Sequence, residues 1–115
     1  MALARKYRLI GKKEFELTKK QGKLVQTPLF ALLINQSNQL EEPKFGFIVS
    51  KKIDRRAIIR HRLKRILSEA VRRILPEIRK DLKVIILAKP ALKQADLNQV
   101  LNLMRKKFGE FAEKK

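Results

Sequence analysis

The sequence predicts a small protein of the α+β class, an α-β sandwich in which one sheet of about four strands packs against three helices. Two observations carry this prediction: short apolar or alternating runs typical of strands, and stretches whose apolar residues recur at helical spacing. The chain has 115 residues, of which 44% are hydrophobic, so it can bury a core large enough to fold alone. We expect a single domain over residues 1–115, with a core of about residues 5–112.

The N-terminal third predicts one helix and two strands. Residues 12–21 have a helical pattern that Gly22 closes, because glycine suits the left-handed position after a helix. Leu24 and Val25 start a short strand. Residues 29–34 form a continuous apolar run, which is compatible with a buried strand.

A polar stretch, residues 35–43, predicts a turn before the next strand. Residues 44–50 then alternate, with Phe45, Phe47 and Val49 on one side. The alternation predicts that these three side chains share one face of the sheet.

A long amphipathic helix is predicted between Asp54, a good N-cap residue, and Pro76, which marks its end. Its apolar stripe consists of Ile59, Leu63, Ile66, Leu67, Ala70, Val71 and Ile74. The opposite face carries His61, Arg65, Ser68 and Arg72, with Arg60 and Arg62 on the flanks. We therefore expect the helix to pack with one side and to expose the other, basic side.

The C-terminal part predicts another strand and a last helix. Residues 84–88 are apolar, and Asp96 is a candidate cap for the helix that follows. The core-spaced residues of that helix are Leu97, Val100, Leu101, Met104, Phe108 and Phe111. Since a strand follows the basic helix, the simplest connection around that helix is a parallel crossover.

The charge of the chain points to a polyanion as its partner. The formal net charge is +18 with a pI near 10.8, and residues 51–73 carry ten Lys/Arg against two acids, net +8. Concentrated positive charge on an ordered element suits RNA or DNA, because each neutralised phosphate releases counterions. Arginine dominates the cluster, and its planar fork can bind two phosphate oxygens or stack on a base.

Composition also excludes several classes of protein. A disordered polycation would lack this many apolar residues, and the absence of cysteine excludes disulfides and thiolate zinc sites. No segment approaches the roughly 20 apolar residues of a membrane span, and no apolar signal region follows the N-terminus. We expect a cytoplasmic protein with no membrane partner.

A family motif runs through residues 45–73, which read FGFIVSKKIDRRAIIRHRLKRILSEAVRR. They resemble the signature region of the bacterial ribonuclease P protein component: a strand ending in Ser/Ala-Lys-Lys, a turn, and a helix opening with Arg-Asn-Arg, an apolar residue and Lys-Arg. Residues 12–23 resemble the first helix of that family, and residues 84–90 its last strand. The resemblance spans roughly residues 5–108.

The resemblance implies both a fold and a function. The crossover around the basic helix would be left-handed, against the usual right-handed rule. The protein would be the protein subunit of ribonuclease P, which binds a catalytic RNA and the 5′ leader of precursor tRNA and assists endonucleolytic removal of the leader. The family also implies one protein per RNA, and Mg²⁺ bound mainly by the RNA subunit and the substrate.

The resemblance assigns two sets of binding residues. The basic helix would face the catalytic RNA through Arg56, Arg60, His61, Arg62, Lys64 and Arg65. The first helix and the open face of the sheet would bind the leader through Phe15, Lys19, Phe47, Lys51 and Lys52. Two positions depart from the family pattern: His61 stands where the family has Asn, and Lys19 where members often have a second aromatic residue.

Each assignment has a structural alternative. The basic cluster could be a solvated face with ion pairs to Glu69, but one glutamate cannot neutralise it, which favours RNA contact. Phe15 lies among lysines with few apolar partners, which favours a functional surface, whereas the pattern leaves Phe47 open between core and groove. Alternation sends Lys51 and Lys52 to opposite faces, so only one of them is expected to face a groove.

The chain lacks the groups for a protein-borne active site. His61 is the only histidine, and the only adjacent acids, Glu41 and Glu42, lie in the predicted turn. A stand-alone nuclease is therefore disfavoured. The remaining rival is a ribosomal-protein-like structural RNA-binding protein, which composition allows and only the motif disfavours.

Overall fold

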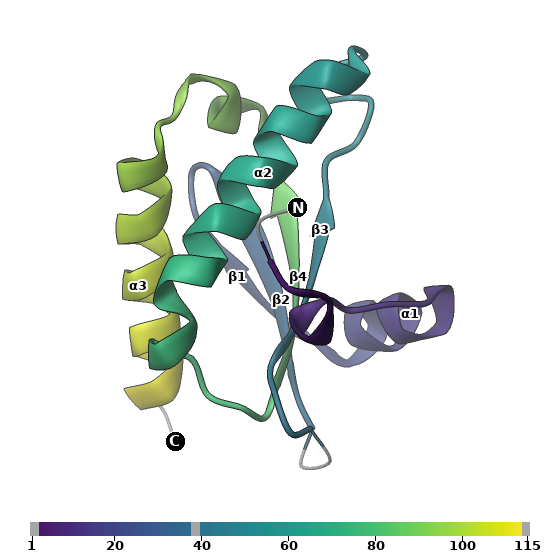
Figure 1. Ribbon diagram of the computed structural model, residues 1–115, viewed down its shortest axis with the longest axis vertical. Coiled ribbons are helices and arrows are strands. Elements are labelled where there is room, and N and C mark those ends of the chain that lie inside the picture. The colour runs from purple at the N-terminus through teal and green to yellow at the C-terminus, as the bar shows by residue number, and fades with distance from the viewer. Residues whose placement is uncertain (1–2, 38–39, 114–115) are drawn as a thin grey trace.

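The computed structural model describes residues 3–37 and 40–113, with side chains as far as residue 110, and it confirms a four-stranded sheet with three α-helices (Figure 1). The elements in chain order are α1 (Lys12–Gln21), β1 (Lys23–Gln26), β2 (Phe30–Gln36), β3 (Lys44–Ile48), α2 (Ala57–Ile74), β4 (Leu82–Ala88) and α3 (Leu97–Glu113). Three short 3-10 turns complete the fold: η1 (Arg5–Tyr7), η2 (Leu75–Glu77) and η3 (Pro90–Gln94).

The strands lie in the order β1-β2-β4-β3. β2 runs antiparallel to both of its neighbours, whereas β3 and β4 are parallel. The predicted parallel crossover from β3 through α2 to β4 is therefore confirmed. Its left-handed sense stays a prediction from the resemblance.

One face of the sheet carries the main core, covered by α2 and α3, which pack against each other (Figure 1). The strand residues of this core are Phe30, Leu32, Ile34, Phe45, Phe47, Leu82, Val84 and Ile86. The apolar stripe of α2 packs against them as predicted, with Ile59 and Ile66 only partly buried. Ser68, predicted on the exposed face of this helix, is instead fully buried. Phe45 meets Phe108 of α3 edge to face, with ring centroids 6.4 Å apart. The side chain of the predicted core residue Phe111 lies outside the described part of the chain.

The other face is covered at one end by α1. Alternation places Leu33, Gly46 and Ile85 side by side on this face, and Ile85 is fully buried. Glu14 of α1 forms an ion pair with Lys83 of β4 at 2.9 Å, which ties the helix to the sheet. The rest of this face is more open, and Leu24 of β1 is 53% exposed.

The N-terminal segment passes round the outer edge of β3 from one face to the other (Figure 1). Leu3 is buried in the core beneath α2, while Arg8 forms a parallel bridge with Phe45, and the backbone N–H of Leu9 donates to the carbonyl of Phe45 at 2.8 Å. Gly11, with φ of +98°, then turns the chain into α1. The segment thereby covers part of an edge that would otherwise be unpaired.

Two predicted helix ends are wrong in detail and one is confirmed. Gly22 is extended, with φ of −74° and ψ of 148°, and glycine is needed because a Cβ there would lie 2.5 Å from the carbonyl oxygen of Thr18. Asp54 does not cap α2: its carboxylate accepts from the backbone N–H of Arg56, which holds the turn before the helix. Asp96 does cap α3, in a reciprocal pair of hydrogen bonds with Gln99.

Candidate nucleic-acid interface

The outward face of α2 presents arginines that have no counterion among the described residues. Arg62 and Arg65 are exposed beside the exposed His61, and none of the three forms a hydrogen bond or ion pair through its side chain within residues 3–37 and 40–110. Two acids lie in α2 and in the turn before it, Glu69 and Asp54, and both form ion pairs with other arginines. Like charges gathered without a counterion favour binding to a polyanion.

An apolar residue stands among these cations. Ile58 is 77% exposed, and with Ile59, His61, Arg62 and Arg65 it lines a shallow hollow of about 390 Å³. Phosphate contacts alone need no exposed isoleucine, whereas an unpaired base can lie against an apolar side chain. The surface can therefore contact more than the backbone of an RNA.

Two of the predicted arginines already have acceptors inside the protein. Arg56 binds the carboxylate of Asp54 through Nε and an Nη, at 3.0 and 2.9 Å, and this arrangement holds the pKa of the Asp54 carboxyl well below its usual range. The Arg60 guanidinium donates to the backbone carbonyls of Asp54 and Arg55. These hydrogen bonds hold the turn before α2. Only the guanidinium N–H groups of Arg56 and Arg60 that are not used in them can bind a ligand.

The positive charge of the last turns of α2 is partly offset inside the protein. Glu69 accepts from Arg72 and from Arg73, and these bonds lower the pKa of the Glu69 carboxyl to about 2. Of the two arginines four residues from Glu69, Arg73 forms an ion pair with it and Arg65 does not. The unpaired positive charge of α2 is thus concentrated toward its N-terminal half.

Phe15 lies on the second surface, between α1 and the sheet. Its ring rests on Gly46 of β3, where a Cβ would come within 2.4 Å of the ring carbon Cζ. Phe15 is partly exposed and does not belong to the main core, whereas Lys19, one turn later on α1, is exposed. An accessible aromatic ring beside lysines is an arrangement on which an unpaired base can stack.

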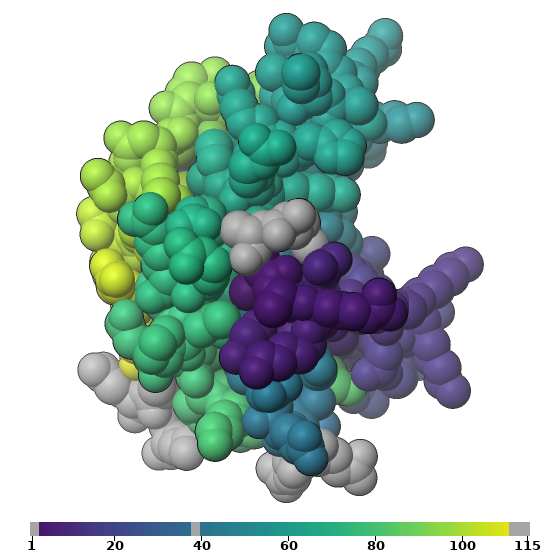
Figure 2. All heavy atoms as spheres, viewed as in Figure 1, coloured from purple at the N-terminus to yellow at the C-terminus, as the bar shows by residue number. Residues whose placement is uncertain are grey.

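The two surfaces meet at the outer edge of β3. Lys64 of α2 and Phe15 of α1 line the same hollow, of about 180 Å³, which also includes Arg8. The space-filling view shows α1 and the N-terminal end of α2 projecting from the same side of the molecule with an indentation between them (Figure 2). A single RNA strand could therefore contact both helices.

Phe47, which the sequence pattern leaves open between core and groove, belongs to the core cluster, although it also lines the hollow that contains Phe15. Phe47 is 9% exposed and packs in the core with α2, whereas alternation along β3 places Gly46, and Phe15 above it, on the opposite face. Base stacking on Phe47 would require unpacking the core, so we assign it a structural role.

Lys51 and Lys52 lie in the turn between β3 and α2, and both are exposed. The expectation that only one of them faces a groove is wrong, because the strand ends at Ile48 and alternation no longer applies. Both line a cationic hollow of about 830 Å³ together with Arg55 and Lys93. Lys93 comes from η3, far along the chain, and no local pattern in the sequence could have grouped it with the turn.

Within the described ranges, no three His, Asp or Glu side chains gather as a metal site. Nor does any helix in those ranges combine the length and apolar character that crossing a bilayer requires.

A sequence profile of the family described as Ribonuclease P matches residues 3–112 of this chain. The chain belongs to the ribonuclease P protein family.

Relatives within this family are similar over most of their length. The Ribonuclease P protein component of Cyanothece sp. (strain PCC 7425) is 28% identical over 123 residues, covering 94% of this chain and 94% of the relative. That of Thermoanaerobacter sp. (strain X514) is 33% identical over 93 residues, covering 81% and 78%.

Solved ribonuclease P proteins share the fold. The protein from Thermotoga maritima superposes with a TM-score of 0.78 at 25% identity, covering 88% of this chain and 94% of that chain. The protein from Staphylococcus aureus gives a TM-score of 0.79 at 23% identity, covering 92% and 94%. The α-β sandwich described above is therefore that of known ribonuclease P proteins.

Proposed function

We propose that this chain is the protein subunit of a bacterial ribonuclease P, which binds the catalytic RNA and the 5′ leader of precursor tRNA and thereby assists removal of the leader. The observation that carries the proposal is the set of unpaired cations on the exposed face of α2, in a chain whose family is that of ribonuclease P proteins. A face of this kind is suited to RNA phosphates.

The two surfaces have different chemistry, which supports a division of labour. The α2 face (His61, Arg62, Lys64 and Arg65) is dominated by charge, which suits the folded backbone of a large catalytic RNA. The α1 surface (Phe15 and Lys19) adds an accessible ring, which suits unpaired bases of a leader. Lys51 and Lys52 extend positive charge beyond the end of β3, where the leader can continue.

The protein contributes binding rather than the reacting groups. His61 is the only histidine of the chain, and it lies exposed on a helix without a neighbouring acid that could share a proton transfer. Endonucleolytic cleavage would then depend on the RNA, with Mg²⁺ held mainly by the RNA and the substrate. The protein's residues would hold the leader in place and lower the repulsion between RNA phosphates.

Reconstitution tests this proposal. The protein is mixed with a bacterial ribonuclease P RNA and a precursor tRNA at low Mg²⁺, and cleavage at the 5′ end of the mature tRNA is measured. We expect cleavage only when both protein and RNA are present. Cleavage by the protein alone would indicate a nuclease, and binding of RNA without any stimulation of cleavage would favour a structural RNA-binding protein.

Variants test the division of labour. Arg62→Ala or Arg65→Ala should weaken assembly with the catalytic RNA by about 1–3 kcal/mol, the size expected for a lost charged hydrogen bond. Phe15→Ala should instead weaken binding of precursor tRNA with a leader and leave assembly and mature tRNA binding nearly unchanged. Arg105→Ala, on α3, removes the same charge away from both surfaces and serves as the control.

If Phe15→Ala unfolds the protein, as circular dichroism would show, Phe15 is a core residue and the leader assignment fails.

A further inference from the structure

Arg8 is an anomaly among the arginines of this chain. Its Nε is buried and has no hydrogen-bond partner, the single buried side-chain nitrogen or oxygen of this kind within the described residues. The guanidinium forms no ion pair with any of these residues either, whereas Arg56, Arg72 and Arg79 each bind a carboxylate. A buried charged donor without an acceptor is unfavourable for the free protein, so its retention needs an explanation.

The backbone holds Arg8 firmly in this position. Its N–H donates to the carbonyl of Arg5 at 3.0 Å, and the bridge to Phe45 fixes the segment against the edge of β3. The Cα of Arg8 is therefore held in place between the α1 surface and the α2 face. Rigid placement of an unsatisfied donor is how a protein prepares a binding site in advance.

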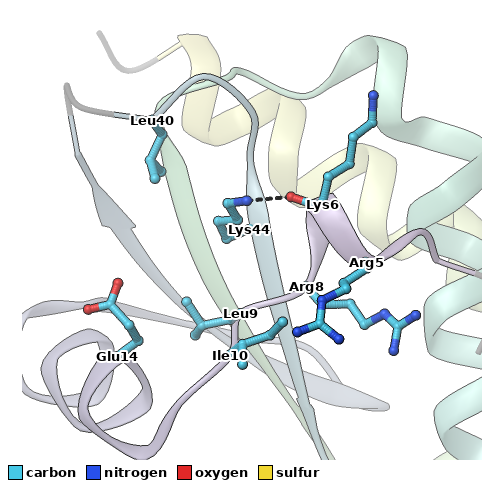
Figure 3. A pocket seen from close by; sticks show the side chains of 8 residues that line it. All are labelled: Arg5, Lys6, Arg8, Leu9, Ile10, Glu14, Leu40 and Lys44. Atoms are coloured by element: carbon cyan, nitrogen blue, oxygen red, sulfur yellow. Dashed lines mark hydrogen bonds between the residues drawn. The ribbon is translucent and has the colours of Figure 1, made fainter.

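The surroundings of Arg8 are cationic. It lines a hollow of about 610 Å³ with Arg5, Lys6 and Lys44, in which the one acid, Glu14, is paired with Lys83 (Figure 3). In the close-up, the guanidinium groups of Arg5 and Arg8 both lie on the side of the hollow away from Glu14 (Figure 3).

On its other side, Arg8 lines the smaller hollow that contains Lys64 and Phe15. Positive groups from the N-terminal segment and from α2 thus converge beside an aromatic ring. A guanidinium presents donors in a planar fork that matches two oxygens of a phosphate, and an ammonium can add a further contact. An anionic phosphodiester with a base beside it fits these donors and this ring.

We propose that Arg8 is a phosphate-binding residue, which with Arg5 and Lys64 binds one phosphodiester of RNA where the strand passes from the α1 surface to the α2 surface. The proposal rests on the proposed function, since it takes the ligand to be RNA. The phosphodiester can belong to the leader or to the catalytic RNA, and the experiment separates the two.

A stability measurement separates binding from packing. Arg8→Met keeps an unbranched side chain as far as the position of Nε but removes the guanidinium donors, so the free protein should melt at the same or a higher temperature. A packing role predicts the reverse, a lower melting temperature with unchanged RNA affinity, and that result would overturn the proposal.

Two binding measurements then identify the phosphate. The first is assembly of wild type, Arg8→Met and the control Arg105→Met with a bacterial ribonuclease P RNA alone. The second is binding of precursor tRNA by the assembled holoenzyme, using leaders in which one phosphodiester at a time is a neutral methylphosphonate.

If the phosphate belongs to the leader, a methylphosphonate at one leader position should weaken binding to the wild-type holoenzyme about 5- to 10-fold. Arg8→Met should weaken binding of the unmodified leader to a similar extent. The methylphosphonate at that position should then weaken binding to Arg8→Met no further. If the phosphate belongs to the catalytic RNA, Arg8→Met should weaken assembly with that RNA about 5- to 10-fold. Each methylphosphonate in the leader should then affect binding to wild type and to Arg8→Met equally. If Arg8→Met binds both the catalytic RNA and precursor tRNA as tightly as the wild type does, the proposal is refuted. Failure of the wild type to assemble or to recognise a leader would instead refute the proposed function.

Discussion

At the scale of single residues, the arginines of α2 differ in whether the protein supplies an acceptor. Arg72 and Arg73 share Glu69, and Arg60 is turned to backbone carbonyls, whereas Arg62 and Arg65 have no partner among the described residues. An arginine with an internal partner gains less from an RNA phosphate, because it must give up or share an existing bond. The internal bonds therefore rank the candidates for RNA binding.

Gly46→Ala should disturb the leader surface without removing any aromatic residue. The new Cβ would lie 2.4 Å from the ring of Phe15, so the ring must move off the sheet. We expect a loss of leader-dependent binding similar to that of Phe15→Ala, with a stability loss of about 1–3 kcal/mol from overpacking. Binding of precursor tRNA with and without a leader, together with urea denaturation, measures both effects.

Gly109→Ala is the matched control, since no atom lies within 4 Å of the position of its Cβ on α3. It should leave RNA binding unchanged and stabilise the helix by roughly 0.5–1 kcal/mol. Wild-type leader binding by Gly46→Ala would show that the position of the Phe15 ring does not matter for the leader.

His61→Asn should keep most of the RNA affinity, and His61→Ala should lose part of it. His61 is exposed beside Arg62 on α2, where a third cation is disfavoured, so we expect a neutral hydrogen-bonding role that an amide can also fill. Affinities for the catalytic RNA between pH 5.5 and 8 should give parallel curves for wild type and His61→Asn. Curves that converge only at high pH would show a cationic role.

At the scale of elements, α2 has two tasks along its length. Its buried stripe, from Leu63 to Ile74, attaches it to the sheet and to α3. Its exposed N-terminal half carries Arg62 and Arg65, which have no partner among the described residues, while Glu69 pairs with both arginines of the C-terminal half. We therefore expect RNA to contact mainly the N-terminal half of the helix.

Removing this acid should change the pH dependence of stability. The folded-state pKa of Glu69, about 2, lies below its ordinary value of 4.5 because Arg72 and Arg73 hydrogen-bond to the carboxylate. Its stabilisation is therefore fully present above about pH 4.5 and is lost as the pH falls toward 2. The difference in melting temperature between wild type and Glu69→Gln should be constant from pH 7 to about pH 5 and shrink below that.

Glu16→Gln on α1, where Glu16 is exposed, is the control and should show little such change. If the melting temperatures of wild type and Glu69→Gln still differ by the same amount at pH 2, the ion pairs of Glu69 with Arg72 and Arg73 do not contribute to stability.

At the scale of the whole molecule, positive charge is spread over several elements that lie close together. The α2 face, the α1 surface, the hollow at Arg8 and the hollow at Lys93 all adjoin β3 or the turn after it. With a net charge of +18, we therefore expect RNA to contact one extended surface rather than a single site.

Salt should weaken RNA binding steeply as a consequence. If roughly five to eight phosphates are engaged, the slope of log affinity against log salt concentration should be about −4 to −7. Titration of the catalytic RNA at a series of salt concentrations gives this slope. A slope near −1 would show that most of the basic surface lies outside the interface.

Local patterns in the sequence determined much of this protein. Residues 12–21 were predicted as a helix and are α1, the stripe of α2 is buried as its spacing indicated, and Asp96 caps α3. These features depend on residues within a few positions of one another, where hydrogen bonding and side-chain periodicity act directly. The family motif at residues 45–73 added the RNA partner, because it combines charge with a fixed spacing.

The tertiary structure alone decided which residues share a surface. The sequence pattern left Phe47 open between core and groove, and the pleat of β3 turns it into the core while Gly46, on the opposite face, supports the partly exposed ring of Phe15. Arg8 gave no sequence signal, and it became a candidate only because the edge of β3 buries its Nε next to Lys64. Burial and the availability of an acceptor depend on neighbours distant in the chain, so no local pattern can report them.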